Sequence, residues 1–168
     1  MANLPTPGGD DGNWGTILNT FLEVDHNAGG TNKEASATYK GVVELATAAE
    51  VNTGTDTTRA VTPATLFTTQ TLTDAASITW DLSLGAMATV TLTDNRALAN
   101  PTNLVNGASY ILIVKQDGTG SRTLSFGSAY KFADGADPVL STSANAVDVI
   151  AFLSDGTSLY GSFQGNFS

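Results

Sequence analysis

The chain has 168 residues, which fits one domain of ordinary size or a small domain with an extended N-terminal arm. Its 16 acidic and 7 basic side chains give a formal net charge of -9, so its surface repels phosphate backbones and we expect no nucleic-acid binding. The absence of cysteine excludes disulfides and thiolate metal sites. No stretch approaches the roughly 20 apolar residues of a membrane-spanning helix, so we expect no membrane insertion and no secretion signal.

The N-terminal segment combines an irregular arm with one amphipathic stretch. Proline and glycine interrupt residues 1–13, whereas residues 14–22 place their apolar side chains at the three-and-four spacing of one helical face. These side chains are Trp14, Ile17, Leu18, Phe21 and Leu22. A short helix with so much apolar surface has to bury it, either on sister copies and later segments of the chain or on a different protein. A polar, glycine-rich link follows over residues 25–37.

Residues 38–68 predict an extended run followed by two short helices. Thr47 and Glu50 have the spacing of a capping box, and Thr62 before Pro63 is a second helix start. Helices this short are marginal alone in water, so we expect their apolar side chains to be buried against other copies of the chain. The predicted trimerisation residues are Val42, Leu45, Val51, Val61 and Leu66.

This segment resembles the tail-fibre repeat of bacteriophages and prophages. The resemblance rests on Gly41-Val42-Val43-Glu44-Leu45-Ala46-Thr47, Ala49-Glu50-Val51, Gly54-Thr55-Asp56, Arg59-Ala60-Val61-Thr62-Pro63 and Leu66. It implies a homotrimer in which the unit links virion-proximal segments to receptor-binding ends. The first 22 residues resemble the N-termini of phage tail and baseplate appendage proteins. This resemblance rests on Leu4-Pro5-Thr6-Pro7-Gly8-Gly9-Asp10-Asp11-Gly12, Trp14-Gly15, Leu18-Asn19 and Phe21-Leu22. That second resemblance implies docking on other tail or baseplate proteins.

From Ile78 onward, alternating apolar residues and frequent turn-forming residues predict short β-strands with closely spaced turns. Apolar residues alternate over 78–82 and 88–92, and nearly continuous apolar runs over 110–115 and 147–153 predict two central strands. Asp155-Gly156 is a hairpin signal. Because no crossover helix is readable between the strands, we expect antiparallel sheets in a jelly-roll-like β-sandwich, with a trimer covering the sheet edges.

The last 90 or so residues also resemble a C-terminal β-module of phage tail fibres. The strings that carry this resemblance are Thr91-Leu92-Thr93, Asn95-Arg96, Asn100-Pro101-Thr102-Asn103, the run from Gln116 through Gly127, Tyr130-Lys131-Phe132 and Val147-Asp148. Together the resemblances imply a mainly β virion protein, made in the bacterial cytoplasm, with three parts. These are a virion-docking arm and helix (1–37), a trimerising connector (38–75) and a C-terminal β-sandwich domain (76–168).

A single copy of the repeat favours a short fibre or spike, whose C-terminal domain either adheres to the host or grips a further virion protein. The predicted receptor-contact residues are Tyr130, Lys131 and Phe132, which would bind carbohydrate or protein of the host surface. They lie between two turn-forming clusters, so we expect them to form a loop.

Catalytic chemistry has little support in the sequence. His26 is the only histidine and lies in the polar link, where nothing rigid positions it. Two pairs of carboxylates could act as acid and base. Asp134 and Asp137 lie in a stretch with the composition of a loop, and Asp10 and Asp11 precede a predicted helix, so we expect turn and capping roles for them. Asp117 and the loop at Asp134 are weak candidates for calcium, because the alternating acids of an EF-hand are missing. We therefore expect no enzymatic activity, no cofactor and no metal.

Overall fold

The structure is a computed structural model that describes residues 42–167, and these fall into two units. The smaller unit contains residues 42–44 and 58–60 of the described part. In it the Ala60 N–H donates to the Glu44 carbonyl over 2.9 Å, and Arg59 Nε donates to Glu44 Oε2 over 2.9 Å. The larger unit, residues 45–57 and 61–167, contains all the helices and strands named below.

Helix α2 (Ala48–Thr53) begins with the predicted capping box. The Thr47 N–H donates to Glu50 Oε2 over 2.8 Å, and the Glu50 N–H donates to Thr47 Oγ1 over 3.3 Å. The helix ends at Gly54, whose φ of 64° lies in the left-handed region that glycine adopts without steric cost. The capping-box prediction is confirmed.

Helix α3 (Pro63–Leu66) begins at the predicted proline. The Thr62 N–H donates to Thr65 Oγ1 over 3.2 Å, and the Thr65 hydroxyl donates to the Thr62 carbonyl over 2.9 Å. Four residues make barely one turn, and these capping contacts add to the two backbone hydrogen bonds that the Thr65 and Leu66 N–H groups donate to the Thr62 carbonyl. The predicted second helix start is therefore confirmed.

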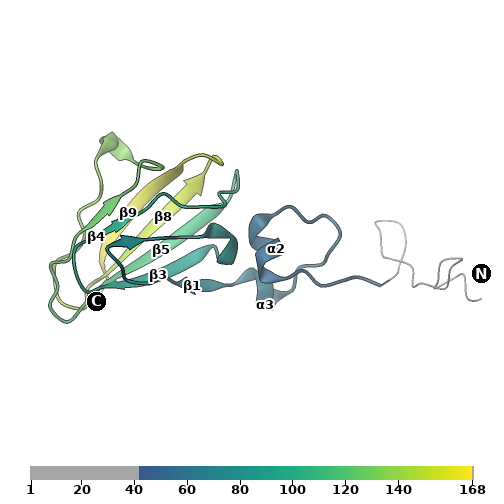
Figure 1. The fold of residues 1–168 in the computed structure, drawn as a ribbon, viewed down its shortest axis with the longest axis horizontal. Coiled ribbons are helices and arrows are strands. Elements are labelled where there is room, and N and C mark those ends of the chain that lie inside the picture. Colours follow the sequence, from purple (N-terminus) through teal and green to yellow (C-terminus); the bar gives the residue numbers. More distant parts are fainter. Residues whose placement is uncertain (1–41, 168) are drawn as a thin grey trace, which may run out of the picture. The chain divides into compact units, whose positions relative to one another are not determined.

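The rest of the larger unit is mainly β (Figure 1). One sheet has six strands in the order β1-β3-β5-β8-β9-β7, and a second has three strands in the order β2-β4-β6. The six strands are β1 (Thr69–Thr71), β3 (Met87–Leu92), β5 (Ser109–Gln116), β7 (Tyr130–Phe132), β8 (Val147–Ser154) and β9 (Leu159–Phe167). The three strands are β2 (Ser77–Ile78), β4 (Arg96–Leu98) and β6 (Leu124–Phe126), and two 3₁₀ turns, η1 (Leu82–Leu84) and η2 (Ala133–Gly135), complete the unit.

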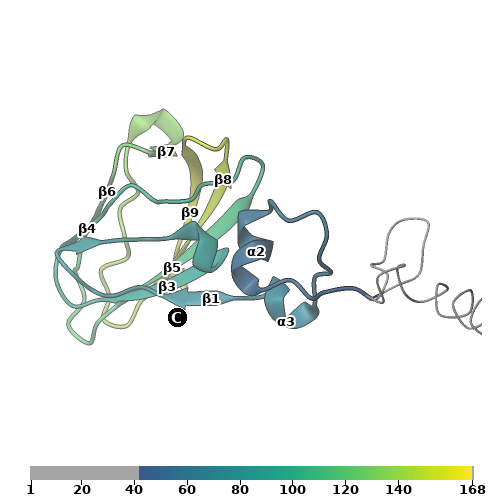
Figure 2. The same cartoon turned by 45° about the vertical axis from the view of Figure 1, so that its right-hand side comes forward.

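Most strand pairs are parallel, so the predicted antiparallel, jelly-roll-like topology is wrong. Strands β1, β3 and β5 pair in parallel, as do β2, β4 and β6, and β7 pairs in parallel with β9. From β1 to β6 the chain alternates between the two sheets and winds as a coil (Figure 2). After each strand of the first sheet, a short strand of the second sheet carries the chain back, so that the next strand of the first sheet runs parallel to the previous one. In most parallel sheets a helix makes this crossover connection. The prediction was wrong because it assumed that only a helix can connect two parallel strands.

The antiparallel part of the domain is at its C-terminal end. Strand β5 pairs antiparallel with β8, and β8 with β9. The predicted hairpin at Asp155-Gly156 joins β8 to β9, and the Asp155 carboxylate accepts the N–H groups of Thr157 and Ser158 over 2.8 and 2.7 Å. Strands β5 and β8 are neighbours in the interior of the sheet, which confirms both predicted central strands.

Both sheets contribute to one hydrophobic core. The predicted alternation over 78–82 and 88–92 is confirmed, since every second side chain in both stretches is buried. Trp80 is 1% exposed and meets Tyr110 and Phe152 edge-on, with ring centroids 6.2 and 6.1 Å apart. The buried members from the two sheets include Ile78, Val90, Leu92, Leu98, Leu112, Val114, Leu124 and Ile150.

Polar side chains connect the successive turns of the coil at one of its ends. Asp74 accepts from Arg96 through Nε over 2.7 Å and Nη2 over 3.0 Å, and also from the N–H and hydroxyl of Thr93. Between the next two turns of the coil, Asn95 Oδ1 accepts the Thr123 N–H over 3.0 Å. The hydrogen bonds from Arg96 are the main cause that lowers the pKa of Asp74 to about 2.

The pH dependence of unfolding tests this connection. The lowered pKa of Asp74 means that its stabilisation is complete above the pKa of the unfolded carboxyl and is lost as the pH falls toward 2. We expect Asp74→Asn to lower the free energy of unfolding by about 1.5–3 kcal/mol at pH 7. In urea titrations the gap to the wild type should narrow below about pH 4. Asp134→Asn, at an exposed position in η2, is the charge-matched control, and equal losses in both variants would contradict the prediction.

Candidate functional site

The predicted trimerisation residues are largely exposed in the single chain. Leu45 is 65% exposed and Leu66 is 52% exposed in the larger unit, where Val61 is also exposed and Val51 is half-buried. Val42, in the smaller unit, is exposed as well. Phe67, which the sequence analysis did not select, follows Leu66 and is 82% exposed. Their burial between copies of the chain stays a prediction, and so does docking through Trp14, Ile17, Leu18, Phe21 and Leu22, which lie outside the described residues.

The triplet read as a receptor-contact loop is strand β7 instead. Tyr130 is 5% exposed, its ring lies 5.5 Å from that of Phe152, and its hydroxyl donates to the Ala99 carbonyl over 3.2 Å. Burial raises the pKa of Tyr130. Tyr130 is therefore a core residue, and its selection as a receptor contact is corrected. Phe132 is half-buried against the core, and only Lys131 is fully at the surface.

The face of the six-stranded sheet that points away from the core lacks acidic side chains. We call this surface the outer face; the strand registers align its residues from β5, β8 and β9 in rows across the sheet. They are Ser109, Ile111, Ile113, Lys115, Val147, Val149, Ala151, Leu153, Tyr160, Ser162, Gln164 and Phe167. Strands β1, β3 and β7 add Thr69, Thr71, Met87, Thr89, Thr91 and Lys131. The outer face thus carries two lysines and no acid, in a chain of net charge -9.

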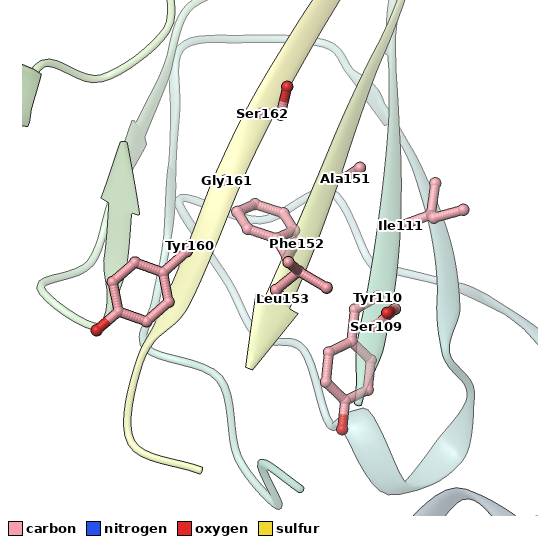
Figure 3. A pocket seen from close by; sticks show the side chains of 9 residues that line it. All are labelled: Ser109, Tyr110, Ile111, Ala151, Phe152, Leu153, Tyr160, Gly161 and Ser162. Atoms are coloured by element: carbon pink, nitrogen blue, oxygen red, sulfur yellow. The ribbon is translucent and has the colours of Figure 1, made fainter. Parts of the chain in front are cut away.

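A depression of about 380 Å³ lies on the outer face where β5, β8 and β9 run side by side (Figure 3). Most of its lining is apolar, with Leu153 and Tyr160 at its side, both more than half exposed. The small side chains of Ser109, Ala151 and Ser162 leave the space open. Such a surface suits an apolar side chain of a partner better than a polar ligand.

Tyr160 is held in place by the hairpin between β8 and β9. Its hydroxyl donates to Asp155 Oδ2 over 2.9 Å, and this hydrogen bond raises the pKa of Tyr160. The N–H groups of Ser158 and Thr157, with the same hydroxyl, hold the pKa of Asp155 below its ordinary value. Both polar groups are therefore engaged within the chain, which leaves the Tyr160 ring as the available contact surface.

The acidic candidates have structural roles in the described part of the chain. Asp117 accepts from Arg122 over 2.9 and 3.2 Å and caps its own turn, and these hydrogen bonds lower its pKa. Asp137 accepts the Phe126 N–H over 3.3 Å, and Asp134 lies in η2. Within residues 42–167 no three metal-ligating side chains gather at one place. His26, Asp10 and Asp11 lie outside this range, and no helix within it is long and apolar enough to cross a membrane.

By fold and surface, residues 42–167 form a mainly β structural module that exposes apolar side chains. The family model described as "Putative phage tail fibre C-terminal domain" matches residues 76–159. The chain belongs to this family and is a structural component of a bacteriophage tail. No curated protein and no solved structure matches the chain significantly.

The outer face was not predicted from the sequence, although a signal for it was present. Over 147–153 every residue except Asp148 is apolar, so both faces of the strand are apolar rather than one. Strands with two apolar faces are typical of sheets that are covered on both sides. The run was interpreted as a sign of a central strand only, and the residues of its second face were not considered as a surface.

Proposed function

We propose that this tail protein is a short, homotrimeric fibre or spike that is attached to the tail or baseplate and adheres to the host surface. The family match over 76–159 carries the proposal, since fibre proteins of phage tails are the class to which the chain belongs. The exposed apolar residues of the segment that resembles the fibre repeat support the trimer, because three copies would bury them. The single histidine and the structural use of the acids support an action without catalysis.

Host adhesion is tested with the full chain. The purified protein, labelled with a fluorophore, is incubated with bacteria of a panel that includes a strain susceptible to the phage. Saturable binding to susceptible cells, and competition with phage adsorption, are expected. Failure to bind any susceptible strain would contradict adhesion, and release of reducing sugars from host polysaccharide would contradict the absence of catalysis.

The second candidate is a connector or decoration protein that binds other tail proteins through its C-terminal domain. The depression on the outer face favours it, because an apolar hollow accepts protein side chains more readily than sugar hydroxyls. A tail protein that co-purifies with the chain and stays bound after removal of residues 1–30 would support this candidate over adhesion.

Charged substitutions in the repeat test the trimer. Leu45→Asp and Val61→Asp each place a carboxylate where three copies would meet, so we expect a loss of roughly 1–3 kcal/mol per chain. The measurement is the melting temperature at one fixed protein concentration. Val139→Asp, at a residue that is 84% exposed and outside the helices and strands, is the control. A melting temperature unchanged from the wild type in all three variants would speak against burial of this segment.

A further inference from the structure

We propose that the outer face of the six-stranded sheet is an interface between copies of this chain, in which the depression beside Leu153 and Tyr160 receives a side chain of the neighbouring copy. The inference rests on the proposed trimer and assigns it a second contact surface, in the C-terminal β-domain. It requires that the outer face be largely apolar, poor in carboxylates and shaped to accept a protein side chain.

Apolar residues occupy the centre of the outer face in adjacent rows. Ile111 pairs with Ala151, and Ile113 pairs with Val149, while Leu153 pairs with Tyr160. Ala151, Leu153 and Tyr160 are exposed, although the same sheet buries a full core on its other side. A contiguous apolar surface of this kind is typical of protein–protein contact sites.

Charge identifies the neighbour. Every copy carries a net charge of -9, so copies repel each other wherever their carboxylates approach. The strands contribute no acid to the outer face, and the Asp155 carboxylate beside the depression is engaged by the Tyr160 hydroxyl; the two charged residues of these strands, Lys115 and Lys131, are opposite in sign to the chain as a whole. In contact with another copy the apolar centre around Ala151 and Leu153 loses water, and Lys115 and Lys131 lie against a chain of opposite net charge. A second copy therefore satisfies both the apolar and the charged part of this surface.

The shape of the surface agrees with this occupant. The depression of about 380 Å³ lies next to Leu153, which is 63% exposed and stands as a projection from the same face. An apolar hollow of this size has room for a side chain of a neighbouring copy. A sugar fits less well, since the Tyr160 hydroxyl is engaged with Asp155 and the remaining lining is mostly apolar.

The absence of cysteine allows a direct test by single thiols. Leu153→Cys and Val139→Cys each give the full chain one reactive group, and both positions are mostly exposed in the single chain. In a sample that sediments as a trimer, we expect a maleimide dye to label Leu153→Cys at least about tenfold more slowly than Val139→Cys, because labelling then needs local opening or dissociation. Circular dichroism checks that both variants are folded.

Two charged variants supply the second measurement. We expect Leu153→Glu to raise the trimer dissociation constant about a hundredfold or more in sedimentation experiments, and Val139→Glu to leave it unchanged. If the wild type is a trimer and both Leu153 variants behave like their Val139 controls, the outer face is not the interface and the proposed trimer stands. If Leu153→Cys is protected only after another tail protein is added, that protein occupies the face and the inference is overturned. If the wild-type chain is monomeric, the proposed trimer is wrong and the inference falls with it.

Discussion

Replacing Phe152 by alanine should lower the free energy of unfolding by about 3–5 kcal/mol, the usual cost of removing a large aromatic side chain from a packed core. Phe152 is 2% exposed and lies on β8, in the interior of the six-stranded sheet. Its ring centroid is 6.1 Å from that of Trp80, 5.5 Å from that of Tyr130 and 6.0 Å from that of Phe132. No neighbouring side chain can fill the space without breaking these contacts.

The loss is measured by urea unfolding at one protein concentration, because the stability of an assembly depends on concentration. Val139→Ala serves as the control, since this side chain is 84% exposed and its removal should change the free energy by less than about 0.5 kcal/mol. A loss below about 1 kcal/mol for Phe152→Ala would show that the aromatic cluster is not the centre of the core.

Gly120→Ala should cost about 2–5 kcal/mol, through backbone strain and a steric clash together. Gly120 has a φ of 76°, and a Cβ atom there would lie 2.4 Å from the Thr142 carbonyl oxygen and 2.8 Å from the Ala144 nitrogen. Both neighbours are backbone atoms, so no side chain can turn aside. The contact joins the turn after β5 to the segment before β8, and the Ser121 N–H donates to the same Thr142 carbonyl over 2.9 Å.

Gly118→Ala is the matched control in the same turn. A Cβ atom at Gly118 would meet nothing within 4 Å. Differential scanning calorimetry should therefore show a clear drop in melting temperature for Gly120→Ala and almost none for Gly118→Ala. Equal effects in the two variants would mean that the close approach of residues 142–144 to this turn is not as the structure has it.

Local features of the fold could be predicted from the sequence because their causes are local. The capping box of α2 needs only Thr47 and Glu50 three residues apart, and the hairpin needs only Asp155-Gly156 between two apolar runs. The buried side of β3 follows from the alternation of Ala88, Val90 and Leu92. The class of protein was available too, through residues 91–148 and their resemblance to fibre modules, and the family match confirms it.

The topology could not be predicted in the same way, because strand direction depends on partners that are distant in the chain. The alternation over 78–82 shows which side chains are buried but not that β2, at its start, belongs to a second sheet. The burial of Tyr130 was missed for a related reason. The flanking glycines suggested a loop, whereas pairing with Leu159 on β9 places the ring inside the core. The strand partners in both cases lie 20 or more residues away.

The coil ends on both sides in very short strands. Strand β1 has 3 residues and β2 has 2 at one end of the two sheets, and β7 and β6 have 3 each at the other. Short outer strands offer few free backbone groups to another molecule, so they resist strand addition. On the β7 side this protection covers only Leu159–Gly161 of the nine-residue β9, so the edge is closed against strand addition at the end of β9 that follows the β8–β9 hairpin.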